Sequence, residues 1–259
     1  MPRAEYTTSP GFRRTSMKKD PQAVLNRLII DRSTFDTTGV ERRATGTINL
    51  LEAEFMKQLI LENGFTTCLE TGVAYGASTV AICSALSVLE SSGKVVRHYG
   101  VDPSQTDVFG GSAMATLAEC GLDHIFELCE GPSHLMLPKL LDRNVTVDFV
   151  FIDGMHTFDY TLLDLFFSDK LLRPGGVLCL HDMHLPSKRK AANYLMRYRK
   201  YVRLPGVKKP LRSRIGGALK EALKLRVGSA WANLSTSEPM LVVKKVANAE
   251  PAWNFYARI

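Results

Sequence analysis

The 259-residue sequence is 45% hydrophobic and 23% charged, which predicts a soluble globular protein with one large α/β domain and little room for a second full domain. No run approaches the roughly 18 consecutive apolar residues of a membrane-spanning helix, and the N-terminus lacks the apolar centre of a secretory signal, so the cytoplasm is the expected compartment. The five cysteines form no C-x-x-C pair and are expected to be inert thiols in the core.

The formal net charge of +7 is unevenly distributed along the chain. Residues 186–226 contain fourteen Lys or Arg and one acid, Glu221, which leaves the remainder with a net charge of −6. We therefore interpret the chain as a mildly acidic domain that carries one basic attachment.

The N-terminal part is predicted to consist of a tail and helices. Residues 1–20 are polar, basic and without apolar periodicity, as is typical of a mobile tail. Residues 21–65 are expected to hold N-terminal helices, the first over residues 21–30, with a Thr-, Asp- and Gly-rich linker after it.

The second of these helices has clear end signals. Asn49 and Glu52 have the spacing of a capping box, and Gly64 is expected to end the helix. Leu51, with Phe55 and Leu59, is expected on the buried face.

From residue 66 the chain alternates between short apolar runs and helical patterns. Strands that alternate with helices of this length indicate an α/β fold, a doubly wound and mostly parallel sheet with helices on both faces. The predicted strands cover residues 66–70, 95–102, 125–129, 147–153 and 176–182, and the predicted helices cover residues 78–89, 111–120, 133–141 and 158–172.

Polar groups end the predicted strands, where doubly wound sheets bind ligands. Glu70 ends the first strand and is followed by Gly72 and Gly76, a spacing that does not fit the G-x-G-x-x-G turn of a pyrophosphate site. The acid suits a ligand with a cationic amino-acid portion, and Asp102 at the next strand end is placed to accept two ribose hydroxyls. Together these residues indicate S-adenosyl-L-methionine.

Two other interpretations of the glycine turn remain open. A tight strand-to-helix turn in another α/β protein has the same sequence pattern. A nicotinamide oxidoreductase would bind NAD, although this turn offers few phosphate contacts.

Two further segments carry a family resemblance, DFVFIDGMHTFDY at residues 148–160 and LLRPGGVLCLHD at residues 171–182. With them the sequence resembles the class I S-adenosylmethionine-dependent methyltransferases, in the small O-methyltransferase branch of the catechol and macrolide-sugar enzymes. The similarity covers residues 45–203 and a closing strand at 240–246. It implies a Rossmann-like seven-stranded sheet with an antiparallel last strand, so that residues 66–259 form the methyltransferase domain with an insertion at 205–239.

The resemblance also implies contacts with the methionine end, the ribose and the adenine of the cofactor. The matching residues are Glu70, Gly72, Gly76 and Ser78 for the first, Asp102 for the second, and Ser133 and His134 for the third, with Asp153 beside them.

In catechol-type enzymes two acids hold a divalent metal such as Mg or Mn, and Asp153 and Asp182 match them. This sequence has Met183 where those enzymes have Asn, and a thioether is a poor ligand for a hard cation. His181 or His184 is expected to supply a nitrogen instead, which favours Mn, Fe, Ni or Zn over Mg. The alternative is that no metal binds.

The family's base follows the first acid by three positions, and His156 stands there. A neutral imidazole, with a pKa near ~6.5, accepts a hydroxyl proton close to neutral pH. The alternative is a loop histidine that caps the following helix. Asp159 and Asp164 are expected on the exposed face of that helix.

The basic attachment starts with a helical pattern over residues 187–203, and residues 214–231 are predicted to form a basic amphipathic segment. In the implied fold, residues 201–204 are expected to form a strand antiparallel to the closing strand at 240–246. Its role has four interpretations: a lid that selects anionic acceptors, a peripheral membrane contact through residues 205–231, a phosphate contact with nucleic acid, or a solvated face. Nucleic acid is disfavoured, because no Asn-Pro-Pro-Tyr-like element is present.

The sequence thus predicts an S-adenosylmethionine-dependent methyltransferase that acts on a hydroxyl of a small-molecule or glycan acceptor, including anionic ones. His156 is the expected general base, with Asp153 beside it in the catalytic site. The alternatives are a non-catalytic cofactor-binding or nucleic-acid-associated protein and a methyltransferase of an anionic lipid at a membrane surface. By family analogy, a homodimer is expected to form through the N-terminal segment.

Overall fold

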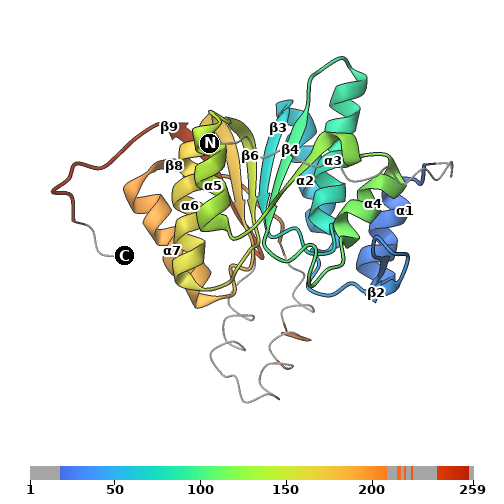
Figure 1. The fold of residues 1–259 in the computed structure, drawn as a ribbon. Helices are drawn as coiled ribbons and strands as arrows, with labels where there is room; N and C mark the ends of the chain where they lie inside the picture. Colours follow the sequence, from blue (N-terminus) through green and yellow to red (C-terminus); the bar gives the residue numbers. More distant parts are fainter. Residues whose placement is uncertain (1–17, 209–214, 217–218, 220–222, 224–237, 257–259) are drawn as a thin grey trace, which may run out of the picture.

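The computed structural model describes residues 18–208, 215–216, 219, 223 and 238–256, and its centre is a seven-stranded sheet. The strands are β3 (Thr67–Thr71), β4 (Arg97–Asp102), β5 (Phe126–Glu130), β6 (Val147–Ile152), β7 (Leu172–Leu180), β8 (Lys200–Arg203) and β9 (Leu241–Ala247). Their order across the sheet is β5-β4-β3-β6-β7-β9-β8 (Figure 1).

All neighbouring strands from β5 to β7 pair in parallel, and β9 runs antiparallel to both β7 and β8. The order reverses at β3, so the carboxyl ends of β3, β4 and β6 meet at the switch point where such sheets bind ligands. The predicted doubly wound, mostly parallel sheet with one antiparallel strand is confirmed.

Helices cover both faces of the sheet (Figure 1). One face carries α2 (Leu50–Asn63), α3 (Ala77–Ser91) and α4 (Ser112–Cys120), with the short turn η2 (Asp123–Ile125), and the other carries α5 (Ser133–Asp142), α6 (Phe158–Leu171) and α7 (Pro186–Tyr198). In β6 the side chains alternate between two hydrophobic cores: Phe149 and Phe151 pack with α2 and α3, whereas Val150 and Ile152 pack with α5 to α7. From Phe149 to Ile152 the strand is therefore apolar, as expected for a sheet buried on both faces.

The N-terminal part contains more than helices. After α1 (Pro21–Asn26) and the π-helical turn η1 (Arg27–Asp31), the linker expected from the sequence forms an antiparallel hairpin of β1 (Ser33–Phe35) and β2 (Glu41–Arg43). Arg27 donates to both oxygens of Glu119 in α4, at 2.8 and 2.6 Å, and the hydroxyls of Thr34 and Thr116 lie 3.2 Å apart. These contacts hold the hairpin against the helix.

Helix α2 begins and ends as predicted but is rotated about its axis. Asn49 accepts a hydrogen bond from the Glu52 amide, the Glu52 carboxylate accepts one from the Asn49 amide, and Gly64 ends the helix in the left-handed region. The predicted face is only partly buried: Phe55 and Leu59 are half-buried against the core, but Leu51 is 60% exposed, and Glu52 and Met56 point inward at 3% and 0% exposure. The rotation brings a carboxylate into the interior.

The basic attachment starts with α7, which ends at Tyr198 and not at residue 203. Its first turn buries Lys188 completely, so this cation does not belong to a solvated face. The predicted tail, up to residue 17, and most of residues 205–239 lie outside the described residues. No helix in the described part of the chain is long and apolar enough to cross a bilayer.

A buried ionic group fastens the β8–β9 edge to α6. Asp169, 4% exposed, lies 2.9 Å from Arg199 Nε and 3.3 Å from Lys245 Nζ, and it accepts a hydrogen bond of 2.9 Å from the Tyr201 hydroxyl. Breaking such a pair leaves an uncompensated buried charge, so these contacts fix the position of the edge strands.

Candidate active site

The turn after β3 is built for close backbone contact. Gly72 has a φ of +87°, and a Cβ atom there would lie 2.5 Å from the carbonyl oxygen of Asp153 after β6. Gly76, also at +87°, caps the start of α3, and Ala74 between them adopts a φ of +46°. The predicted glycine turn therefore lies directly against the end of β6.

Asp102 at the end of β4 holds this turn in place. Its Oδ2 atom accepts hydrogen bonds from the amides of Val73 and Ala74, at 3.0 and 2.8 Å, and its Oδ1 atom accepts one from Ser104 at 2.8 Å. Gln105, which the sequence did not single out, donates to the Ala74 carbonyl at 2.7 Å while its own Oε1 atom is buried without a partner among the described residues. The turn and the loop after β4 thus form one unit.

Glu70 and Ser78, both assigned to the methionine end of the cofactor, contact each other. Glu70 is fully buried and accepts hydrogen bonds from the hydroxyls of Ser78 and Thr79, at 2.7 and 2.5 Å, with His98 Nε2 at 3.1 Å. In the structure these residues brace β3 against α3 beneath the glycine turn. Their contact with a cofactor remains a prediction.

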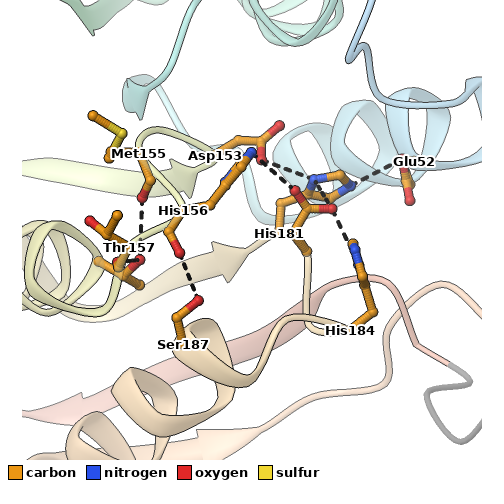
Figure 2. A network of polar contacts seen from close by, with 10 residues as sticks. Glu52, Asp153, Met155, His156, Thr157, His181, His184 and Ser187 are labelled. Carbon is orange, nitrogen blue, oxygen red and sulfur yellow. Dashed lines mark hydrogen bonds and ion pairs between the residues drawn. The ribbon is translucent and has the colours of Figure 1, made fainter. Parts of the chain in front are cut away.

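The ends of β6 and β7 carry an acid–histidine cluster, which consists of Asp153, His156, His181, Asp182 and His184. Figure 2 labels each of these residues except Asp182. His181 Nδ1 lies 3.0 Å from Asp153 Oδ1 and 3.5 Å from Asp182 Oδ1. Ligand atoms of Asp153, His181 and Asp182 all lie within 4.8 Å of one another. The structure therefore brings together the three residues that the sequence assigned to a metal.

His156 lies on the exposed side of this cluster. Its Nε2 atom is 3.5 Å from Asp182 Oδ2, and its side chain is 52% exposed. Its backbone carbonyl accepts a 2.6 Å hydrogen bond from the Ser187 hydroxyl at the start of α7 (Figure 2). Thr157, and not His156, is the N-cap residue of α6, and no side chain caps that helix.

The loop after Asp182 is fixed by its backbone. Asp182 has a φ of +58°, which is costly for a residue with a side chain, and Arg189 in α7 donates to the carbonyls of Met183 and His184 at 3.0 and 2.7 Å. Met183 packs against the core, so the position that holds Asn in catechol-type enzymes offers no ligand here.

Electrostatics within the cluster oppose the effect of burial. Burial alone would lower the pKa of His181, but the negative charges of Asp153 and Glu52 and the hydrogen bond to Asp153 raise it well above its usual value. Burial would raise the pKa of Asp182, yet the charges of His181, His156 and His184 lower it. His181 and Asp182 thus stabilise each other's charged forms.

Two further charged groups, Asp164 and Lys188, lie behind the cluster; Asp164 was expected on an exposed helix face, and a solvated face was one interpretation of the segment that contains Lys188. Asp164 in α6 is 1% exposed, accepts a 2.9 Å hydrogen bond from the Thr71 hydroxyl and has its pKa raised by burial. Lys188 is fully buried, has no hydrogen-bond partner among the described residues and has its pKa lowered by burial, while Asp153, Asp182 and Asp164 act against that shift. The prediction of an exposed Asp164 was wrong, whereas Asp159 is exposed as expected.

The two residues assigned to the adenine border start α5. Ser133 is buried and hydrogen-bonds to Asp164, and the His134 ring lies edge-on to Tyr160 with ring centroids 5.6 Å apart. Asp164 therefore links the start of α5 to the end of β3.

A periodicity signal could have revealed the missed residues. The buried positions of α6 include Thr161, Asp164, Leu165 and Ser168, whose spacing is that of one helical stripe. Lys188 has the same relation to Ala191 and Leu195 in α7. Polar residues on an inward stripe are thus the signal for both.

The chain was compared with known proteins and structures. A family model described as a methyltransferase domain matches residues 69–183, and no curated protein matches the sequence. The O-methyltransferase TomG of Streptomyces achromogenes, involved in tomaymycin synthesis and solved with S-adenosylmethionine, has a TM-score of 0.58 and 18% identity over 78% of this chain and 82% of its own.

Two more structures share the fold. An O-methyltransferase from Bacillus cereus, solved with S-adenosylhomocysteine, has a TM-score of 0.58 and 15% identity over 77% of this chain and 83% of its own. A structure from Klebsiella pneumoniae has a TM-score of 0.62 and 15% identity over 88% and 91% of the two chains. At these identities the likeness concerns the fold. Residues 69–183 therefore match a methyltransferase domain, and the seven-stranded sheet has the fold of these O-methyltransferase structures.

Proposed function

We propose that this protein is an O-methyltransferase that transfers a methyl group from S-adenosyl-L-methionine to a hydroxyl of a small molecule or glycan, at a site that holds a divalent cation. The observation that carries this proposal is the convergence of Asp153, His181 and Asp182 beside the glycine turn, with the His156 ring on the other oxygen of Asp182. O-methyl transfer needs an activated hydroxyl next to the methyl donor, and this arrangement supplies groups for both tasks.

The cofactor would lie over the glycine turn and the end of β4. Asp102 already accepts the amides of Val73 and Ala74 through Oδ2, and its Oδ1 atom, which accepts the Ser104 amide, keeps acceptor capacity for a ribose hydroxyl. The Oε1 atom of Gln105, which is buried and has no hydrogen-bond partner among the described residues, adds a further acceptor at the same edge. S-adenosylmethionine, when bound, supplies the methyl group as a sulfonium. The cofactors present in the TomG and Bacillus cereus structures support this assignment.

The donor set fits a divalent cation. Two carboxylates and one imidazole converge within 4.8 Å, and such mixed oxygen and nitrogen donors suit Mn²⁺, Fe²⁺ or Zn²⁺ better than Mg²⁺. A cation held by Asp153, His181 and Asp182 would polarise an acceptor oxygen. Met183 packs against the core and supplies no ligand, so the imidazole of His181 is the proposed third ligand.

His156 is suited to remove the acceptor proton. Its half-exposed ring is accessible to an acceptor that approaches from solvent, and Asp182 Oδ2, 3.5 Å away, orients the ring. Methyl transfer is an in-line displacement, so the acceptor oxygen must be held opposite the sulfur while its proton leaves. An anionic acceptor is proposed because of the positive charge of residues 186–226.

The test is a calorimetric titration with S-adenosylhomocysteine, with NAD as a control, each with and without Mn²⁺. We expect binding of S-adenosylhomocysteine alone, and one Mn²⁺ per chain that is lost in Asp153→Asn. Once an acceptor is found, His156→Ala should lower kcat by about 10²–10⁴-fold at unchanged affinity for S-adenosylhomocysteine. Equal rates for His156→Ala and the parent would exclude His156 as the general base. Activity that persists after chelation would exclude a catalytic cation.

A further inference from the structure

Helix α2 reaches the acid–histidine cluster from outside the segment that the family model matches. Glu52 Oε2 lies 3.4 Å from His181 Nε2, and the two side chains are 4% and 12% exposed (Figure 2). The match begins at residue 69, so this carboxylate belongs to the N-terminal part of the chain. A buried acid on the far side of a candidate ligand needs a physical reason.

The two nitrogens of His181 face different partners. Nδ1 points to Asp153 Oδ1 at 3.0 Å and to Asp182, which are the other two candidate ligands, whereas Nε2 points to Glu52. An imidazole binds a cation only through a nitrogen that carries no proton. The Glu52 carboxylate contacts Nε2 as an ion pair without hydrogen-bond geometry, and its negative charge favours a proton on that nitrogen, which leaves the Nδ1 lone pair for the side of the two acids.

Glu52 is itself held in position. Its carboxylate accepts the Asn49 amide at 2.8 Å, while the Asn49 side chain accepts the Glu52 amide at 3.0 Å. The carboxylate cannot turn away from His181 without breaking this capping box, and its negative charge is favoured in the first turn of a helix. The capping box at the start of α2 thus fixes the position of the Glu52 carboxylate.

We propose that Glu52 is a positioning residue, which fixes the tautomer and the ring orientation of His181 for a divalent cation held with Asp153 and Asp182. This inference rests on the cation site of the proposed function. It gives the N-terminal helix a part in the site, because the third ligand is oriented only when α2 is docked.

The experiment compares Glu52→Gln with the parent and with Glu54→Gln. Glu54 lies on the same helix, its side chain is 50% exposed and it pairs with Lys57, so its loss controls for a missing negative charge on α2. Glutamine at position 52 keeps an oxygen that accepts the Asn49 amide. Zn²⁺ affinity is measured by calorimetry with S-adenosylhomocysteine bound, and ¹⁵N NMR of histidine-labelled, Zn²⁺-loaded protein reports which His181 nitrogen carries the proton.

We expect Zn²⁺ affinity to fall by about 10–100-fold in Glu52→Gln and to stay unchanged in Glu54→Gln. In the parent, Nε2 should carry the proton and Nδ1 should show the metal-bound shift. Glu52→Asp, which keeps the charge but shortens the reach, should also lose affinity, and unchanged binding of S-adenosylhomocysteine verifies that each variant is folded.

The outcomes separate the two proposals. Parent-like Zn²⁺ affinity in both position-52 variants, or a proton on Nδ1 in the loaded parent, would overturn the role of Glu52 while the cation site stands. A parent that binds S-adenosylhomocysteine but no Zn²⁺ or Mn²⁺ would overturn the cation site and the role of Glu52 with it.

Discussion

At the scale of single residues, Asp102 shows how one side chain prepares a binding surface. It binds the amides of Val73 and Ala74 on one side and that of Ser104 on the other, so it joins two loops of different strands. The same carboxylate is the proposed acceptor for the ribose. Its two tasks are compatible, because an ionised carboxylate accepts about four hydrogen bonds.

We expect Asp102→Ala to weaken S-adenosylhomocysteine binding by more than about tenfold, since the turn loses its acceptor and the ribose loses its partner. The fold should persist, at a cost of about 1–3 kcal/mol in the free energy of unfolding. Calorimetry and urea unfolding measure the two effects. Asp107→Ala, on the exposed part of the same loop, is the control and should change neither. Parent-like affinity in Asp102→Ala would exclude Asp102 from the cofactor site.

The residues of the candidate site were predictable where they end strands. Asp102, Asp153 and Asp182 could be located because the apolar runs before them are unambiguous and strand ends converge in a parallel sheet. Glu52 and Lys188 could not be assigned to the site, because their helices have polar residues on the inward stripe, and the usual contrast between apolar and charged faces then indicates the wrong rotation. For α2, the wrong rotation meant that Glu52 was not predicted to lie in the interior near the site.

At the scale of elements, Asp148 connects the starts of three strands. Its Oδ2 atom accepts the amides of Thr66 and Thr67 ahead of and within β3, at 2.7 and 3.0 Å, and Arg173 in β7 donates to Oδ1 at 2.5 Å. Burial would raise the pKa of Asp148, but the hydrogen bond from Arg173 and those from the two amides hold it below its usual value. Such a carboxylate stabilises the native state only when it is ionised.

Because the pKa of Asp148 is lower in the folded than in the unfolded state, its contribution is fully present above the unfolded value near ~4 and is lost as the pH falls through the folded value. At pH 7, urea unfolding should therefore give Asp148→Asn a free energy of unfolding about 1–2 kcal/mol lower than that of the parent. This difference in free energy should become smaller below pH ~4. The exposed Asp142→Asn serves as the control. A difference in the free energy of unfolding between Asp148→Asn and the parent that does not change with pH would contradict a stabilising role of the ionised Asp148.

At the scale of the whole molecule, the thiols report on the cooperativity of the domain. All five cysteines lie in the described residues and are free, and four of them are buried. Burial raises the pKa of Cys120 and of the partly exposed Cys129 to about 11. Thiolates are therefore scarce at pH 8 in the native state, and access requires opening of the core.

We expect an aromatic disulfide reagent at pH 8 to react slowly with the native protein and rapidly with five thiols in concentrated urea. Stopped-flow absorbance gives both rates. S-adenosylhomocysteine should slow the native reaction further, because a ligand that binds only the folded state stabilises it. Rapid labelling of a native thiol would show that part of the core opens independently.

The connection between β8 and β9 is a place where this domain can tolerate changes in length. The chain leaves β8 with the Leu204 amide bonded to the Val242 carbonyl at 2.9 Å, and it returns with Glu238 2.5 Å from Arg203. Residues 205–237 thus start and finish at adjoining points of one strand pair, and the cost of closing a loop rises only slowly with its length. A gene for this domain can therefore lengthen, shorten or replace that segment without altering the strands that carry the proposed site.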